Sequence, residues 1–327
     1  MQRNWWLWCL GMPLLGSCLL MGECVPAMGA EPHDNDWFLM TSHVEEKDGL
    51  HLAVSPDGLK WQAVNGDKSV LPITIPEVFR DPSIAKDEAG LYHLIWTIAW
   101  GCEKHKGIGY ASSRDLINWS EQRIIPLMEA EPETEFIWAP ELFWDSDKKE
   151  WMIHWSSSVT GKFPETLGLF DGHSNPRIYY TTTKDFITFT PAKLLFNADC
   201  LAIDSYVYRA DQNSYYVFFK ADRKETPKRG LLMAKAPTPT GPYVLEPKMI
   251  TAAEEGWAEG PCAVKVGQKT RLYYAPPKDF GAYETTDMKN WANIRKDMVS
   301  PGGYRHGTVI RISADEAQRL LNHDYIK

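Results

Sequence analysis

The sequence of 327 residues predicts an all-β protein, a five-bladed β-propeller in which the N- and C-terminal strands close the ring. Three observations lead to this fold. Short segments rich in Val, Ile, Tyr, Trp and Phe are separated by turn residues, and long amphipathic helical patterns are missing before the C-terminus. Two different motifs each recur five times along these segments. The first motif series begins before the second, and the second ends after the first.

The first 30 residues differ in composition from the rest and predict a secretory leader. Arg3 precedes an apolar run over residues 5–21, and small residues follow, which is the order of a signal peptide. We place cleavage between Ala27 and Ala30, so the mature protein is expected to be secreted or periplasmic. The letters "LLGSC" also resemble a lipoprotein signal ending at Cys18, which would leave the protein lipid-anchored at the cell surface. A retained membrane helix is disfavoured, since glycine and proline interrupt the run.

Residues 31–327 are expected to form one propeller domain. The formal net charge is -8 and Lys and Arg are scattered, which excludes the basic surface that nucleic acid requires. Membrane contact is therefore expected only through the alternative lipid anchor. Cys102, Cys200 and Cys262 remain outside the leader, and they are too few for a disulfide framework and match no zinc spacing. We expect buried thiols there and no metal site.

The first motif series is a polar tight turn followed by an aromatic residue. Asp57-Gly58 is the plainest hairpin signal among its members. Each turn is expected to join two strands, and each trailing ring to pack between sheets. The members are "SPDGLKW" (55–61), "SSRDLINW" (112–119), "TTKDFITF" (182–189), the diverged "APTPTGPY" (236–243) and "TTDMKNW" (285–291).

The second series marks the beginning of one strand per blade. Three members carry a proline (Pro82, Pro140 and Pro261), which a central strand excludes but the first residue of an edge strand tolerates. The innermost strand of a propeller blade is such an edge and lines the axial channel. The members are "RDPSI" at Asp81, "WAPELFW" at Glu141, "AIDSYVY" at Asp204, "AEGPCAV" at Glu259 and "YRHGTVI" at His306.

The two ends of the chain are expected to complete the fifth blade. Residues 37–61 read as outer strands without an inner strand, and residues 304–313 as an inner strand without outer partners. Ser313 and Glu316 form a capping-box pattern that predicts one short terminal helix.

Ring closure predicts a cluster of carboxylates at one end of the axis. Inner strands that run outward from a common axis begin close together, so the second series should place Asp81, Glu141, Asp204, Glu259 and His306 side by side. Like charges at short range raise the pKa of at least one carboxyl group, an arrangement typical of acid–base chemistry. Two carboxylic acids on either side of a sugar can hydrolyse a glycosidic bond.

These five motifs, in this order and spacing, resemble the blade signatures of glycoside hydrolase family 43, a family of five-bladed inverting glycosidases. The resemblance implies that Asp81 is the general base and Glu259 the general acid, and that Asp204 adjusts the pKa and orientation of that acid. His306 takes the place of a channel histidine that in relatives touches a central water or ion. Glu141 departs from the pattern, since many relatives carry an aspartate or a neutral residue there. We expect it to bind a sugar hydroxyl or to form a salt bridge.

Four more residues are candidates for substrate binding. Trp100, Trp138 and Trp257 flank the inner-strand openings, where an indole face could stack on a sugar ring, and core packing is an equal alternative for each. Arg305 could bind hydroxyls or neutralise the carboxylates. No metal and no cofactor are expected, because a single histidine cannot make a site. A hydrogen-bonded structural role for His306, or an ion beside it, stays open.

The resemblance thus implies an inverting hydrolase that removes terminal pentofuranosyl or pentopyranosyl residues from oligo- or polysaccharide fragments. Release of α-L-arabinofuranose is the first expectation, with β-xylosidase or galactofuranosidase activity close behind. A non-catalytic carbohydrate-binding propeller is the alternative from another class. A retaining fructan-type hydrolase would need a nucleophile motif that "HDNDWF" (33–38) matches poorly. A phosphorolytic enzyme would need basic residues beside the acid, where the sequence offers only Lys265.

Overall fold

The structure is a computed structural model that describes residues 36–46, 48–75, 78–167, 174–197, 200–222, 230–251, 257–276 and 279–325. All of these belong to one compact unit, Asp34–Lys327. The predicted leader over residues 1–30 lies outside the described residues and stays a prediction. Among the described residues, no helix has the length and apolar character needed to cross a membrane.

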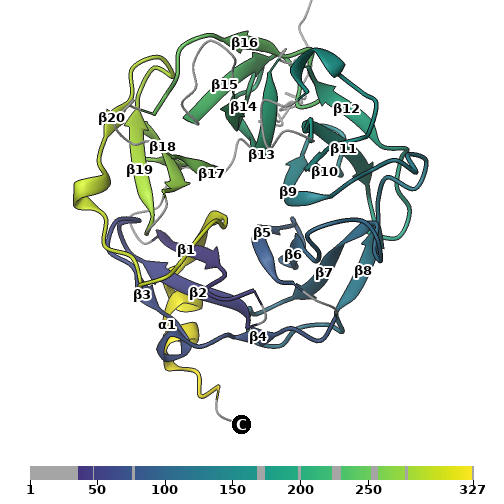
Figure 1. The fold of residues 1–327 in the computed structure, drawn as a ribbon. Coiled ribbons are helices and arrows are strands. Elements are labelled where there is room, and N and C mark those ends of the chain that lie inside the picture. Colours follow the sequence, from purple (N-terminus) through teal and green to yellow (C-terminus); the bar gives the residue numbers. More distant parts are fainter. Residues whose placement is uncertain are drawn as a thin grey trace, which may run out of the picture. The chain divides into compact units, whose positions relative to one another are not determined.

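Five antiparallel sheets are arranged around a common axis as the blades of a propeller (Figure 1), which confirms the predicted fold. Blade 1 contains β5 (Arg80–Lys86), β6 (Tyr92–Thr97), β7 (Gly107–Ser113) and β8 (Arg123–Pro126). Blade 2 contains β9 (Trp138–Asp145), β10 (Glu150–Ser157), β11 (Arg177–Thr183) and β12 (Lys193–Phe196). Blade 3 contains β13 (Leu201–Asp211), β14 (Ser214–Asp222), β15 (Gly230–Ala236) and β16 (Val244–Glu246). Blade 4 contains β17 (Glu259–Val266), β18 (Lys269–Ala275), β19 (Gly281–Thr285) and β20 (Ala292–Asn293).

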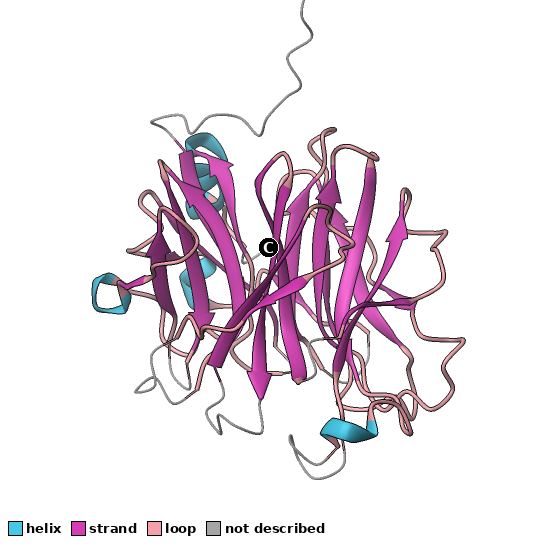
Figure 2. Ribbon diagram, turned by 90° about the horizontal axis from the view of Figure 1, so that it is seen from above, coloured by secondary structure: helices cyan, strands magenta, loops and turns pink. Residues whose placement is uncertain are grey.

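Blade 5 is shared between the two ends of the chain, as predicted. Its strands, from the axis outward, are β21 (Val309–Ser313), β1 (Asp36–Ser42), β2 (Gly49–Ser55) and β3 (Gln62–Ala63), and β4 (Leu71–Pro72) pairs beside β3 on β2. The closing pair is antiparallel and runs in register from Asp36 opposite Ser313 to Met40 opposite Val309. Figure 2 shows the strands of the propeller from a second direction.

Helices are few and short in the described part of the chain. The C-terminal helix α1 (Ala314–Asn322) begins with the predicted capping box, in which the Glu316 N–H donates to the Ser313 hydroxyl and the Glu316 carboxylate accepts from the Ser313 N–H. The same carboxylate accepts from Lys86 and from the Tyr92 hydroxyl, both at 2.7 Å, so it also fastens α1 to blade 1. Single 3-10 turns are η1 (Asn65–Asp67), η2 (Pro164–Thr166) and η4 (Arg295–Asp297).

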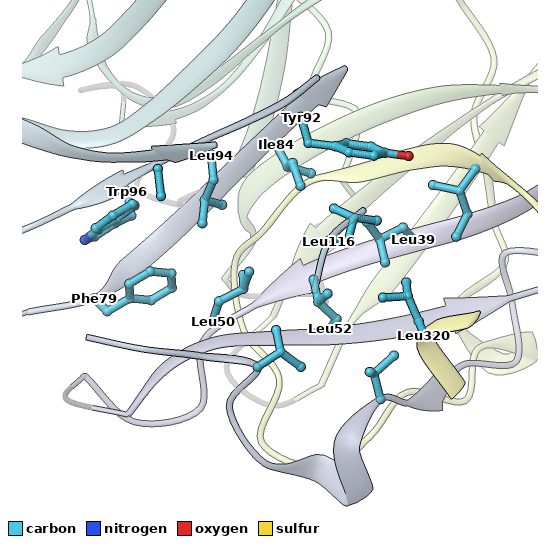
Figure 3. Close-up of a cluster of buried hydrophobic side chains, with 14 of the residues drawn as sticks. Leu39, Leu50, Leu52, Phe79, Ile84, Tyr92, Leu94, Trp96, Leu116 and Leu320 are labelled. Carbon is cyan, nitrogen blue, oxygen red and sulfur yellow. The ribbon is translucent and has the colours of Figure 1, made fainter. Parts of the chain in front are cut away.

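The core lies between the blades rather than inside any one of them. Neighbouring residues of a strand point to opposite faces of the sheet, so Leu52 joins the cluster between blades 5 and 1 while Ala53 joins that between blades 4 and 5. Five such clusters are described, one for each pair of adjacent blades. Figure 3 shows the cluster between blades 5 and 1, which Leu320 of α1 completes.

The first motif series forms the turn between the third and fourth strands of every blade, as predicted. The trailing ring of each turn packs against a different interblade cluster. These rings are Trp61, Trp119, Phe189, Tyr243 and Trp291. The repeat is therefore a packing device that supplies one aromatic side chain to each interface between blades.

Candidate active site

The inner strand of every blade begins with the same one-residue β-bulge. In blade 1 the pairing steps from Arg80 opposite Thr97 to Ser83 opposite Ile95, and blades 2 to 4 repeat the shift. Blade 5 shows it between the His43–Arg305 bridge and the pairing of Met40 with Val309. In four blades the bulged residue has a left-handed backbone, with φ of 50° at Asp81, 47° at Ala139, 53° at Asp204 and 55° at Gly260. Bulges commonly redirect a side chain beside a functional site.

This register sorts the inner-strand residues into three sets. The rim positions are Arg80, Trp138, Ile203, Glu259 and Arg305. The bulge positions follow each by one residue and are Asp81, Ala139, Asp204, Gly260 and His306. The deep positions lie two residues further along and are Ser83, Glu141, Tyr206, Cys262 and Thr308.

The expected equivalence of the five motif residues is therefore wrong for two of them. Asp81, Asp204 and His306 share the bulge positions, whereas Glu259 lies at a rim position and Glu141 at a deep position. The prolines of the motifs would have given the correct alignment, because each directly follows a bulge position. Proline is tolerated there because the bulge leaves that residue outside the ladder.

The backbone N–H groups of the bulged residues are bound by side chains of the preceding blade. The Asp81 N–H donates to His43 Nδ1 at 3.4 Å, and the Ala139 N–H donates to Thr97 Oγ1 at 2.9 Å. The bulge in blade 3 repeats the arrangement, with its N–H donating to Ser156 Oγ at 2.9 Å. These contacts hold a strained conformation in place without using the site carboxylates.

Asp81 is a buried carboxylate held by two donors. His306 Nδ1 lies 3.2 Å from its Oδ1, and Thr97 donates to its Oδ2 at 2.9 Å. Burial alone would raise the pKa of Asp81, but the charge and hydrogen bond of His306, with Arg80 and His43, hold it well below its usual value. Asp81 is thus ionised at neutral pH.

His306 and His43 flank Asp81 in opposite protonation states. Burial would lower the pKa of His306, but the charges of Asp81, Asp204 and Glu141 raise it to about 9. Burial lowers the pKa of His43 to about 4 despite the nearby Asp81. One imidazolium and one neutral imidazole therefore face the same carboxylate.

Asp204 is the second buried carboxylate at a bulge position. Its Oδ2 accepts from the Gly260 N–H at 3.4 Å. Burial raises the pKa of Asp204 to about 6, and Glu259 and Asp81 act in the same direction while His306 and Lys220 oppose them. Asp204 therefore changes charge close to neutral pH, beside a second carboxylate.

Glu141 lies below the bulge positions and is 2% exposed. Ser83 donates to its Oε2 at 2.5 Å, and Thr308 donates at 3.2 Å. Burial raises the pKa of Glu141 to about 8, against these hydrogen bonds and the charge of His306. A carboxylate enclosed in this way is not presented to a sugar, so the structure does not support the expected hydroxyl contact.

Glu259 is the most accessible of the four carboxylates, with its side chain 29% exposed. Lys220 Nζ lies 2.7 Å from its Oε2 and 3.7 Å from the centroid of the Trp257 ring. Sequence reasoning missed Lys220 and considered Lys265 beside the acid instead. A lysine at the end of the apolar run "YYVFFKAD" on β14 was the available signal, since lysine is rarely buried without a partner.

Two of the predicted tryptophans form an aromatic rim near Asp81. Trp100 is 51% exposed, which rules out core packing, and its Nε1 donates to Glu46 while the Arg80 guanidinium lies 4.3 Å from its ring centroid. Trp138 Nε1 donates to the Trp100 carbonyl, and its ring stacks on Phe136 at 3.8 Å. Trp100 is therefore a fixed and open ring face.

Arg305 is exposed at the rim of blade 5, and both of its backbone polar groups bond with the Ser42 hydroxyl. Its guanidinium is near enough to act on His43, so it belongs to the same charged neighbourhood.

Among the described residues, no three His, Cys, Asp or Glu side chains are grouped to hold a metal ion. An ion beside His306 stays a prediction.

The inner strands of this five-bladed propeller bring acidic side chains and His306 together at the axis, which is the kind of site that glycoside hydrolysis requires. A family model of the family 43-related type, described as "Probable glycosyl hydrolase domain", matches residues 36–318. The chain belongs to this family and is a glycoside hydrolase. No curated protein matches the chain.

Solved structures with the same fold include several glycosidases. An α-L-arabinofuranosidase from Lactobacillus brevis is 19% identical, with a TM-score of 0.52 over 66% of this chain and 72% of that one. A thermostable family-43 glycoside hydrolase is 17% identical, with a TM-score of 0.55 over 72% and 80%. An exo-β-1,3-galactanase from Clostridium thermocellum is 13% identical, with a TM-score of 0.52 over 78% of this chain and 52% of that one. At these identities the similarity supports the fold alone.

Proposed function

We propose that the protein is an exported inverting exo-glycosidase that removes terminal pentose units, with α-L-arabinofuranose as the first candidate. The observation that carries the proposal is the pairing of an ionised buried carboxylate, Asp81, with a partly exposed one, Glu259, two blades apart in the ring. These are the two kinds of carboxyl group that an inverting glycosidase requires. Export rests on the leader predicted from the sequence.

In this mechanism Glu259 gives its proton to the leaving glycosidic oxygen as the bond from the anomeric carbon to that oxygen breaks. Asp81 takes a proton from a water molecule, whose oxygen attacks the same carbon from the opposite face. The product sugar has the opposite anomeric configuration, and the two carboxyl groups exchange protonation states. Asp204, buried beside Glu259, responds to the charge on that residue.

The position of His306 favours a spacing wide enough for the water. His306 belongs to blade 5, which separates blade 1 with Asp81 from blade 4 with Glu259. Its ring contacts Asp81 on one side and packs against Gly260 on the other, where an added Cβ would lie 2.5 Å from the ring. An imidazole between the two sides of the site supports the separation of roughly 6.5–9.5 Å found in inverting enzymes.

The choice of sugar rests on the family resemblance and on two tryptophan side chains. The resemblance favours arabinofuranose, and the similar structures include an arabinofuranosidase and an exo-β-1,3-galactanase. Xylosides and galactofuranosides follow from the resemblance as well. Arg80 covers one ring face of Trp100 near Asp81, and Lys220 covers one ring face of Trp257 near Glu259. We propose the opposite face of each ring as a sugar contact on its side of the bond to be cleaved.

Phosphorolysis is the second candidate, because a basic residue does lie beside the proposed acid, at Lys220. Lys220 is already paired with Glu259, however, and an attacking phosphate would approach from the side of Asp81. The ionised carboxylate there would repel it, which favours water as the nucleophile.

The test is a panel of nitrophenyl arabinofuranoside, xyloside, galactofuranoside and galactoside, with the anomer of the product followed by NMR. We expect inversion on one of these sugars without added phosphate. On a natural oligosaccharide, Glu259→Gln should lower kcat by about 10²- to 10⁴-fold and leave ligand binding intact, whereas Glu246→Gln at an exposed position should change neither. Retention, phosphate dependence or inactivity throughout would each contradict the proposal, the last in favour of a binding module.

A further inference from the structure

Lys220 interrupts the repeat of the propeller at the point where the proposed acid lies. The residue opposite each rim position is His43, Thr97, Ser156, Lys220 or Ala275. His43, Thr97 and Ser156 accept a hydrogen bond from the bulged N–H of the next blade. An ammonium group cannot accept a hydrogen bond, so Lys220 cannot bind the bulged N–H of blade 4 in this way.

A neighbouring carboxylate accepts the hydrogen bond from the bulged N–H of blade 4 instead. The Gly260 N–H donates to Asp204 Oδ2 at 3.4 Å, where the repeat would supply a hydroxyl or an imidazole nitrogen. The ammonium reaches one residue further back, to the rim position of blade 4, and contacts Glu259. Lys220 therefore points to the side chain at the rim rather than to the backbone.

Lys220 is buried, and its ammonium contacts Glu259 and Trp257 among the described residues. Its side chain is 4% exposed, whereas that of Glu259 is 29% exposed. Its Nζ contacts the Glu259 carboxylate at 2.7 Å and the Trp257 ring face at 3.7 Å from the centroid. Burying a charge this deeply costs free energy unless the charge is paired. The ion pair with Glu259 therefore compensates for the burial of Lys220.

We propose that Lys220 is a positioning residue for the general acid: it holds the Glu259 carboxyl group at the rim and stabilises the negative charge that forms there as the proton leaves. The inference rests on the proposed function, in which the Glu259 proton passes to the glycosidic oxygen. The attraction between Lys220 and Glu259 is strongest after that transfer, so it favours the transition state over the protonated ground state.

This role makes a prediction about leaving groups. An alkyl or sugar leaving group needs the proton of Glu259, whereas 2,4-dinitrophenolate departs without it. On the acidic plateau of each pH profile, Lys220→Met should lower kcat for a natural oligosaccharide by about 10- to 100-fold and for the dinitrophenyl glycoside by less than about 3-fold.

Lys220→Arg keeps the charge and should recover most of the activity on the oligosaccharide. Lys235→Met, at an exposed lysine of β15 in the same blade, should behave like the wild type. Melting temperatures of all variants separate a loss of folding from a loss of positioning, and Lys220→Gln serves if the methionine variant does not fold.

The double variant Lys220→Met with Glu259→Gln decides whether the lysine acts through the acid. We expect Lys220→Met to add almost nothing to the loss of activity that Glu259→Gln causes alone. An equal loss on both leaving groups or an additive double variant would overturn the role of Lys220. If Glu259→Gln itself shows no preference between leaving groups, the assignment of the acid fails, and the proposal fails with it.

Discussion

Aspartates occur at repeated positions in two regions of this propeller, and they are stabilised in opposite ways. In the outer turns the acid follows a Ser or Thr by two residues, and its Oδ1 accepts from the two backbone N–H groups that lie two and three residues further on. Asp115, for example, accepts from Ile117 at 3.0 Å and Asn118 at 2.8 Å. The same bonds recur at Asp57, Asp185 and Asp287.

The bulge positions at the axis use charges instead. Among the described residues, Asp81 pairs with the Thr97 hydroxyl and the His306 imidazolium, and Asp204 accepts from the Gly260 N–H at 3.4 Å. In the turns, backbone N–H donors lower the pKa of Asp115 to about 2, although burial opposes them. At the axis, burial raises the pKa of both carboxylates: that of Asp204 rises to about 6, whereas the charge and hydrogen bond of His306 keep that of Asp81 low.

The difference shows where the repeat is under structural constraint and where it is free to change. A turn needs the same bonds in each blade, so the sequence motif survives in four blades with little change. At the axis only the backbone bulge is common to all five blades, and the bulge position holds aspartate in two blades and alanine, glycine or histidine in the others. Where the backbone is the same in every blade but the side chains differ, the difference therefore indicates a functional site.

The largest expected effect comes from the same isosteric change made in both regions. Asp81→Asn removes the charge that accepts the proton from water, so we expect kcat to fall by about 10²- to 10⁴-fold. Asp115→Asn keeps an oxygen that can accept the two backbone bonds, so its activity and melting temperature should stay close to those of the wild type. Steady-state kinetics and thermal unfolding of the purified variants measure both.

Equal activity of the two asparagine variants would contradict the contrast between charge and backbone bonding.

A smaller effect is expected from the pH dependence of stability. The pKa of His306 rises from 6.5 to about 9 on folding, so its contribution to stability is complete below pH 6.5 and is lost as the pH rises through 9. The melting temperature of His306→Gln should therefore lie furthest below that of the wild type near pH 6, and the gap should close toward pH 10.

Glu141 loses its proton in the same range, because burial raises its pKa to about 8. The comparison is therefore repeated in proteins that carry Glu141→Gln. There the melting temperature of His306→Gln should again lie furthest below that of the protein with His306 near pH 6. A gap between wild type and His306→Gln that is constant from pH 6 to pH 10 would show that the histidine is not charged in the folded protein.

Much of this arrangement could be predicted from the sequence, and the reason lies in which features repeat. The aromatic turns and the proline-marked strand beginnings are local patterns, so the number of blades and the closure by β1 and β21 could be predicted. The register of the site was missed, because Glu259 lies one residue before the bulge position that Pro261 marks. Lys220 was missed for another reason: the apolar run around it indicates a buried lysine but not its partner, which lies 39 residues away in the next blade.

The smallest expected effect tests whether an outer turn matters only for stability. Asp115→Ala removes the acceptor for two backbone N–H groups, and we expect a loss of about 1 kcal/mol, or roughly 2–4 °C in melting temperature for a protein of this size. Activity should be unchanged, because the turn lies between the third and fourth strands, far from the inner strand. Glu121→Ala, at an exposed position after the same turn, serves as the control. If Asp115→Ala lowers kcat at a temperature where it is fully folded, the two regions are coupled through blade 1. The turn would then have to be counted as part of the support of Asp81, since both belong to that blade.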